Sequence, residues 1–229
     1  MENTYTKQDA IITSLTLPST PNSTLELLKS DIKTRTFQKG EYIFISDQEI
    51  QYVIGINYGV AKMYFMDHLG NEFTLKILTQ GDFTGHRQIL DNEKFAGYIQ
   101  VLEETEISML SKNMFLKLLD EDININKLII KKLCFDLRLA KEIIENLSLK
   151  DVKHRICSIL KKLHKQFSDE GSNEINADLS REDFAKLVGV ARESLSRSLG
   201  ELVSEGVIAI EKKRIKILDW NQLNKLSKI

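Results

Sequence analysis

The stretch from Leu179 to Leu202, LSREDFAKLVGVARESLSRSLGEL, constrains this chain more than any other. Ser180 suits a helix N-cap, and Asp183, three residues later, can take the place of the Glu in a capping box. Gly189 suits the left-handed backbone conformation in which helices commonly end. The stretch therefore predicts two short helices joined by a tight turn.

The second of these helices begins near Ala191 and separates apolar from polar side chains. Its apolar face carries Leu195, Leu199 and Leu202. Its polar face carries four side chains at i, i+1, i+4 and i+5, which are Arg192, Glu193, Ser196 and Arg197. In a helix-turn-helix the second helix enters the DNA major groove, where such side chains can bond to base edges. The alternative is an ordinary helical hairpin with a solvated charged face.

The segment GVARESLSR resembles the recognition helix of the Crp/Fnr family of bacterial transcription regulators. Gly189, Arg192, Glu193 and Arg197 fall at the family's positions, which implies DNA binding. Arg192, Glu193 and Arg197 match the base-reading set of the nucleotide-responsive branch. Glu193, Ser196 and Arg197 match that of the oxygen-responsive branch. The resemblance therefore implies a palindromic operator with a TGTGA-like or a TTGAT-like half-site.

Basic and hydroxyl side chains around the two helices are candidates for contact with DNA phosphates. Helix N-termini and their hydroxyl groups suit phosphate oxygens. After the second helix, Ile208 and Ile210 are expected to pair with Ile215 and Ile217 in a basic hairpin, the wing of a winged helix-turn-helix. The candidates are Ser180, Arg181, Ser194, Lys212 and Lys213.

The charge distribution fits a DNA-binding module on an acidic body. The net charge is only −1, but from Ser148 onward 16 Lys and Arg stand against 12 Asp and Glu, and before it 16 stand against 21. The composition, 42% hydrophobic and 28% charged, is that of a globular protein. No apolar run approaches the roughly 18 residues of a membrane span. We expect a cytoplasmic protein that does not bind membranes.

Residues 36 to 110 show short alternating runs punctuated by glycine, which predict an antiparallel sandwich or barrel. HLGNE at 68–72 predicts a hairpin turn. KGE at 39–41, the Asp67–Glu72 turn and QGDFTG at 80–85 resemble the cyclic-nucleotide-binding-type β-roll, a jelly roll, of the same family. The fold class implied is α+β. We expect a weakly structured start before this region, with one short helix near 19–29.

A long helix is predicted from about residue 124 to 146. Six apolar residues alternate at spacings of three and four, which is a heptad seam, and they are Ile130, Leu133, Leu137, Ala140, Ile144 and Leu147. The alternative is a core helix packing on the β-roll. The family dimerises through a helix at this place, and a dimer can reach two half-sites. We therefore expect a homodimer, with a hinge at Leu147–Asp151. The expected domains are the β-roll at 1–120, the dimerisation helix and hinge at 121–149, and the winged helix-turn-helix at 150–229.

The resemblance also places an effector pocket in GHRQILDNEKFAGY at 85–98. A cyclic-nucleotide pocket of the family needs a Glu for the ribose and an Arg-Ser pair for the phosphate. Here His86 stands in place of the Glu and Phe95-Ala96 in place of the Arg-Ser pair. Without the Arg there is no bidentate phosphate partner, so tight binding of cyclic AMP is not expected. The candidate pocket residues are Gly85, His86, Arg87, Phe95, Ala96 and Tyr98.

The two cysteines, Cys134 and Cys157, indicate neither a disulfide framework nor an iron–sulfur cluster. The oxygen sensors of the family carry an N-terminal cysteine cluster, and residues 1–35 contain no cysteine. Haem stays open, since histidines and methionines lie in and near the β-roll. We expect Cys134 to be a buried small hydrophobe, with a redox switch at the dimer seam as the alternative.

The sequence does not predict an enzyme, because it contains no P-loop, nucleophile elbow, paired metal-ligand motif or dinucleotide fingerprint. The competing hypothesis is a metabolite-binding regulatory module whose C-terminal helices bind a protein partner rather than double-stranded DNA. If the protein is an activator, RNA polymerase is a further expected partner.

Overall fold

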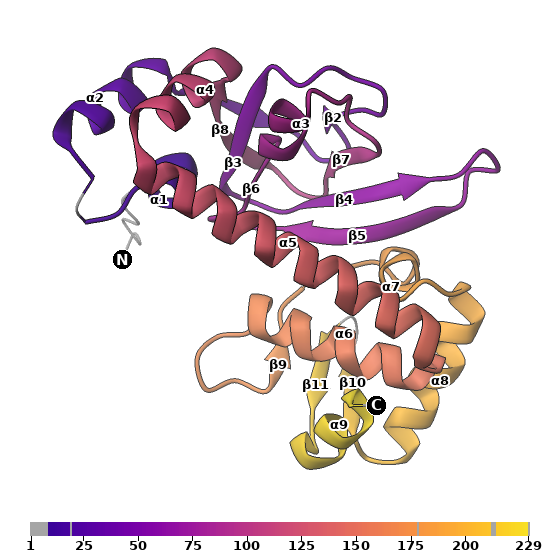
Figure 1. The fold of residues 1–229 in the computed structure, drawn as a ribbon. Coiled ribbons are helices and arrows are strands. Elements are labelled where there is room, and N and C mark those ends of the chain that lie inside the picture. The colour runs from indigo at the N-terminus through magenta and orange to yellow at the C-terminus, as the bar shows by residue number, and fades with distance from the viewer. Residues whose placement is uncertain (1–8, 19, 178, 212–213, 229) are drawn as a thin grey trace. The chain divides into compact units, whose positions relative to one another are not determined.

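The computed structural model describes residues 9–18, 20–177, 179–211 and 214–228. The chain forms two compact units, Met1–Leu137 and Arg138–Ile229. The boundary falls inside the long helix α5, Ile123–Leu149 (Figure 1). Within the described parts of the chain, no helix is both long enough and apolar enough to cross a membrane.

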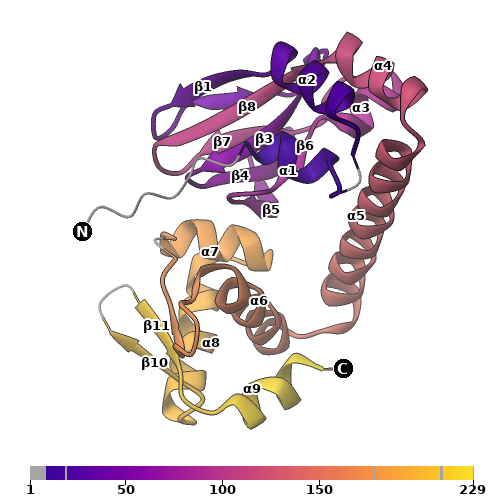
Figure 2. The ribbon, with the colours of Figure 1, turned by 90° about the vertical axis from the view of Figure 1, so that its left-hand side faces the viewer.

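The N-terminal unit is built around two four-stranded antiparallel sheets (Figure 2). Their strand orders are β1-β8-β3-β6 and β2-β7-β4-β5. The strands are β1 Lys33–Phe37, β2 Tyr42–Phe44, β3 Tyr52–Tyr58, β4 Ala61–Met66, β5 Glu72–Leu78, β6 Phe83–Thr84, β7 Tyr98–Val101 and β8 Thr105–Ser111. The helices of this unit are α1 Ala10–Leu15, α2 Asn22–Asp31, α3 His86–Asp91, α4 Lys112–Glu121 and the first part of α5. This is the predicted β-roll.

The β-roll closes because its strands contribute apolar side chains to one core and its turns are tight. Ile54 and Ile56 of β3 and Ile107 of β8 are each no more than 1% exposed and belong to one core cluster. At the β3–β4 turn, Gly59 has φ +91°, and a Cβ there would lie 2.5 Å from the Glu104 carbonyl oxygen. Only glycine fits such a backbone position.

The expectation of a weakly structured start is wrong for residues 9–15, whereas α2, Asn22–Asp31, confirms the short helix predicted near 19–29. Asp9 Oδ1 accepts hydrogen bonds from the Ile11 and Ile12 backbone N–H groups, at 2.9 and 3.1 Å, and so caps α1. Ile11 and Leu15 are fully buried. α1 packs on β3 at Gly55, where an added Cβ would meet the Ala10 Cβ at 2.9 Å. The first helix is thus part of the roll's core.

The C-terminal unit contains the end of α5 followed by a helical bundle and a small sheet. Its other elements are α6 Val152–Phe167, β9 Glu174–Ile175, α7 Arg181–Val188, α8 Arg192–Ser204, β10 Ile208–Glu211, β11 Arg214–Ile217 and α9 Trp220–Ser227. In the hairpin, Ile208 pairs with Ile217 and Ile210 with Ile215, which confirms the predicted register. The sequence did not predict β9, which adds a third strand, or α9.

α5 extends further than predicted, so the hinge is shorter. The helix continues to Leu149, and α6 begins at Val152 with Asp151 as its N-cap, accepting from the His154 backbone N–H at 2.9 Å. Only Lys150 and Asp151 therefore connect the two helices. A serine caps α4 in the same way, because Ser111 Oγ accepts from the Met114 backbone N–H.

The heptad seam of α5 is mostly exposed in the single protomer. Ile130, Leu137 and Ile144 are 59%, 72% and 63% exposed, and Ala140 and Leu147 are exposed as well. Leu133 is half-buried against the core of the β-roll. A row of exposed apolar side chains at heptad spacing is what an unpaired coiled-coil seam presents to its partner.

Candidate DNA-binding site

Helix α7 is fixed at both ends by contacts that the sequence predicted. Ser180 Oγ accepts a hydrogen bond from the Asp183 backbone N–H at 3.0 Å and donates to Asp183 Oδ2 at 2.6 Å. At the other end, Gly189 has φ +72° and its N–H donates to the Ala185 carbonyl oxygen at 2.9 Å. The left-handed conformation costs other residues roughly 1–2 kcal/mol. Glycine therefore sets the turn between α7 and α8.

Helix α8 has one buried and one exposed face. Leu195, Leu199 and Leu202 are at most 2% exposed and pack in the core of the C-terminal unit. The four predicted base-reading residues are all exposed on α8, and they are Arg192, Glu193, Ser196 and Arg197. Ala191 is the N-cap and supplies no side-chain acceptor, so the first N–H groups of α8 have no side-chain cap. The exposed polar side chains therefore lie in the first two turns of α8, next to its uncapped N–H groups.

The charged side chains of this face are available to an external partner. Within the part of the chain that the structure describes, the side chains of Arg192, Glu193 and Arg197 form no hydrogen bond or ion pair. Ser196 Oγ donates to the Arg192 carbonyl oxygen at 2.9 Å, so its hydroxyl proton is already used and its lone pairs remain. Two guanidinium groups flanking a carboxylate and a hydroxyl can bond to guanine, cytosine and phosphate groups.

The candidates for phosphate contact differ in how exposed their side chains are. Ser180 is exposed, but its hydroxyl both accepts from and donates to Asp183. Arg181 is half-buried, and this burial lowers the pKa of its guanidinium, which nonetheless stays protonated at neutral pH. Ser194 is half-buried in the first turn of α8. Lys212 and Lys213 lie outside the described residues. The phosphate contacts stay predictions.

Helix α6 supports the turn through a residue that sequence reasoning missed. Arg155 Nη1 donates to the Gly189 carbonyl oxygen at 3.4 Å. Lys153, on the same helix, forms an ion pair of 2.5 Å with Glu205 at the end of α8. Nothing in the local sequence marks these contacts, because the partners lie 34 and 52 residues apart.

One predicted effector residue, His86 of α3, contacts the long helix α5. Gly85 has φ +94°, and His86 is only 2% exposed. His86 Nε2 lies 3.5 Å from Asp136 Oδ2, and Asp136 also pairs with Lys132, one helical turn earlier on α5. Burial lowers the pKa of His86, and the nearby Asp136 opposes this effect. The i, i+4 pair was the one sequence signal that could have marked this cluster.

The other predicted effector residues do not form one polar site with His86. Arg87 is exposed and pairs with Asp91 and Glu93 at 3.6 and 3.7 Å. Phe95 is 2% exposed and packs against Phe44 with ring centroids 5.3 Å apart. Ala96 is exposed, and Tyr98 stacks on Tyr64 at 5.2 Å. The buried side chain of Phe95 therefore occupies the position at which a cyclic-nucleotide pocket would need an arginine for the phosphate.

The two cysteines differ in environment. Cys134 is exposed in the protomer, so the expectation of a buried thiol is wrong there. Cys157 is fully buried, and burial raises the pKa of its thiol to about 11, which disfavours the reactive thiolate. Among the residues that can be placed, no three His, Cys, Asp or Glu side chains are grouped as metal ligands.

Two family models match the chain. The model of the Crp-like helix-turn-helix domain matches residues 154–226, and that of the cyclic nucleotide-binding domain matches residues 34–122. The first match contains α7, α8 and the wing, and the second contains the β-roll. The segment between them is mainly α5.

Relatives and solved structures match over most of this chain. Electron transport regulator A of Shewanella oneidensis is 26% identical over 96% of this chain and 89% of its own length. An anaerobic regulatory protein of Bacillus subtilis is 29% identical over 81% and 79%. FixK2 of Bradyrhizobium japonicum has a TM-score of 0.79 at 18% identity, covering 86% of this chain and 98% of that structure. A CooA mutant of Carboxydothermus hydrogenoformans has a TM-score of 0.76 at 20% identity, covering 97% of both.

Proposed function

We propose that this chain, which belongs to the Crp/Fnr family of helix-turn-helix transcription regulators, binds a palindromic DNA site as a homodimer. The observation that carries the proposal is the exposed polar face of α8, opposite a face buried in the core. The alternative, a metabolite-binding module with a protein partner at its C-terminal helices, is not favoured by these matches.

We assign base reading to the first two turns of α8. Arg192 and Arg197 are suited to bidentate bonds with guanine O6 and N7, and Glu193 to accepting a bond from cytosine N4. Ser196 can accept a bond through its free lone pairs. Ser180, Arg181 and Ser194, with Lys212 and Lys213, are proposed to contact phosphates and so to set register and salt dependence.

We assign dimerisation to the exposed seam of α5. Two copies of the helix packed in parallel would cover Ile130, Leu137, Ala140, Ile144 and Leu147, and the two α8 helices would then address half-sites about one DNA turn apart. In functional terms the chain divides into a β-roll at 1–120, a dimerisation helix at 121–149 and a DNA-binding domain at 150–229. RNA polymerase is a further proposed partner if the protein is an activator.

We assign no cofactor. The burial of Phe95 and the pairing of Arg87 with two carboxylates argue against a cyclic AMP phosphate site at 85–98. Two cysteines cannot supply four iron–sulfur ligands in one chain. Haem is the remaining alternative, and an absorbance spectrum of the purified protein tests it, since bound haem gives a Soret band. We also propose a cytoplasmic location, as for a regulator that acts on DNA.

Selection of DNA from a random pool tests the proposal. The purified protein should enrich a palindrome with a TGTGA-like or TTGAT-like half-site. Recovery of single half-sites without symmetry would argue against the dimer. Enrichment of no sequence, either alone or with cell extract added to supply an effector, would argue against the proposed function itself.

A further inference from the structure

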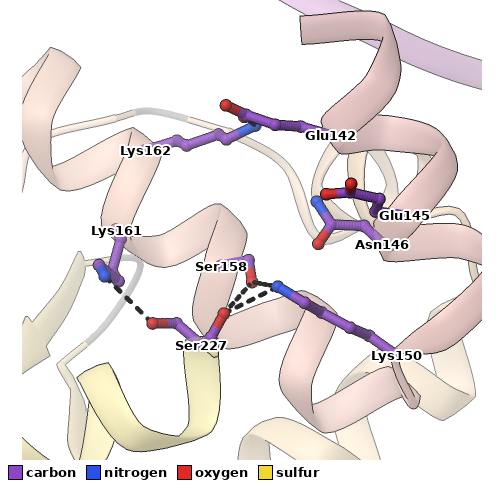
Figure 3. Close-up of a pocket in the computed structure, with 8 residues that line it drawn as sticks. All are labelled: Glu142, Glu145, Asn146, Lys150, Ser158, Lys161, Lys162 and Ser227. Atoms are coloured by element: carbon purple, nitrogen blue, oxygen red, sulfur yellow. Dashed lines mark hydrogen bonds and ion pairs between the residues drawn. The ribbon is translucent and has the colours of Figure 1, made fainter. Parts of the chain in front are cut away.

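A pocket of about 230 Å³ lies in the C-terminal unit where the end of α5, helix α6 and the last turn of α9 meet (Figure 3). Lys150, one of the two residues that connect α5 to α6, extends into it. Its Nζ donates to Ser158 Oγ on α6 at 3.1 Å and to the Ser227 carbonyl oxygen on α9 at 2.8 Å. Ser158 Oγ itself lies 3.2 Å from the same carbonyl oxygen.

The carbonyl oxygen of Ser227 is a suitable acceptor for a lysine. Carbonyl groups in the last turn of a helix have no partner within the helix, and the helix dipole favours positive charge at that end. Lys150 therefore satisfies an end group of α9 while holding α6 in the same contact. The contact joins residues 77 positions apart in the sequence.

Two further contacts join the same three helices around this pocket. Lys161 Nζ donates to Ser227 Oγ at 3.1 Å, and Lys162 pairs with Glu142 of α5 at 2.8 Å. Burial lowers the pKa of Lys150, and the charge of Lys162 adds to this effect. Lys150 is thus partly desolvated, unlike a lysine on an open helix surface.

We propose that Lys150 is a positioning residue for DNA binding, because it ties the α5–α6 connection to α6 and α9 and so fixes the direction in which the winged helix-turn-helix leaves α5. The inference rests on the proposed function, since this direction matters most when two recognition helices must match the spacing of a palindrome. Lys150 acts through Ser158 and Ser227 and makes no contact with DNA.

Comparing a full palindrome with a single half-site tests the proposal. The first step of binding places one α8 in one half-site, and the second gains from the fixed geometry of the dimer. Lys150→Ala should weaken binding to the palindrome by about tenfold or more, leave half-site affinity within about twofold, and relax the preference for one spacing. Lys150→Arg should restore part of the loss.

Matched variants separate positioning from other roles. Lys165→Ala removes an exposed lysine from the same helix α6 and should bind both DNAs like the wild type. Deleting residues 227–229 removes one of the two acceptors of Lys150, so it should reproduce part of the effect of Lys150→Ala, and adding the deletion to Lys150→Ala should change binding little further. If Lys150→Ala weakened both DNAs equally, or lowered the slope of log Kd against log salt, Lys150 would be a stabilising or phosphate-contacting residue and the proposal would be wrong.

A measurement without DNA decides the proposal even if the wild type binds no palindrome. Nitroxide labels are placed at Lys141→Cys on α5 and Glu201→Cys on α8, in a Cys134→Ser background. Electron–electron double resonance, with unlabelled protein in excess so that dimers carry labels on one copy only, then gives the distribution of distances between the two labels across the α5–α6 connection. Lys150→Ala should broaden the distance distribution, and Lys165→Ala should not. Equal widths would overturn the proposal. Failure of palindrome binding by the wild type would instead count against the proposed function.

Discussion

Arg192 and Arg197 are the residues on which the proposed recognition of DNA bases depends most. Both are exposed on α8, and within the described residues neither has an internal partner that binding would have to break. Arg can bond to two guanine acceptors at once, so each such contact discriminates by about 1–3 kcal/mol against the wrong base. Specificity should therefore be concentrated in a few side chains.

Arg197→Ala should weaken binding to the selected operator by about 1–3 kcal/mol and relax the base preference at one position of each half-site. Fluorescence anisotropy with a set of single-base operator variants measures both effects. Lys225→Ala, an exposed lysine on α9, serves as the control and should keep the full base preference. An equal loss on every DNA sequence would mean that Arg197 contacts phosphate rather than a base.

His86 should make the stability of the protein depend on pH, because burial lowers the pKa of its imidazole and so disfavours protonation in the folded state. The unfolded chain has an ordinary histidine pKa of about 6.5 and takes up a proton more readily than the folded protein. Stability from this site is therefore complete above that pH and is lost as the pH falls below it. Lys132 and Lys76 repel the added charge, whereas Asp136 attracts it.

His86→Gln should reduce the loss of unfolding free energy between about pH 7.5 and pH 5, since the variant has no imidazole to protonate. Urea unfolding at several pH values gives the slope, which is compared instead of the absolute stability. His68→Gln, in the exposed β4–β5 turn, is the matched control and should keep the wild-type slope. Parallel curves for the wild type and His86→Gln would contradict this prediction.

At the scale of elements, the tight turn between α7 and α8 depends on one glycine. Gly189→Ala places a Cβ in the left-handed conformation and should lower the free energy of unfolding by roughly 1–2 kcal/mol. Gly200 lies in the interior of α8 with open space around an added Cβ. Gly200→Ala should therefore raise stability by roughly 0.5–1 kcal/mol. Chemical unfolding measures the two changes in the free energy of unfolding, which should have opposite signs. A lower free energy of unfolding for both variants would contradict the explanation.

The seam of α5 should be required for association but not for the fold of the protomer. Leu137 is 72% exposed, so Leu137→Glu removes little from the core while placing two carboxylates in the proposed coiled coil. The variant should be monomeric by light scattering at concentrations where the wild type is dimeric. Leu69→Glu, equally exposed in the β4–β5 turn, should stay dimeric. A dimeric Leu137→Glu protein would exclude this seam as the interface.

The elements that the sequence predicted best are those fixed by neighbouring residues. Ser180 and Gly189 lie at the ends of α7 as predicted, because caps are satisfied within four residues. Helix α1 and strand β9 were missed because a six-residue helix and a two-residue strand carry little periodicity. Their stability comes from packing on β3 and pairing with β11, which local sequence does not encode.

At the scale of the whole molecule, the sequence predicted the architecture but not the contacts that join distant segments. The order of glycine-punctuated strands, seam and helix-turn-helix was enough for the fold. Lys150 and Ser227, Arg155 and Gly189, and His86 and Asp136 meet only in the folded chain. The polar side chains among them resemble ordinary surface residues in the sequence, so their roles could not be predicted.

The most direct test of sequence-specific DNA binding is the salt dependence of the dissociation constant for the selected palindrome and for scrambled DNA of equal length. The dimer should prefer the palindrome by at least about a thousandfold. With six to ten phosphate contacts, its affinity should fall by about 10³–10⁵ between 50 and 200 mM salt. Equal affinity for both DNAs, or an affinity for the palindrome that does not change with salt, would contradict the assignment of α8 as a recognition helix.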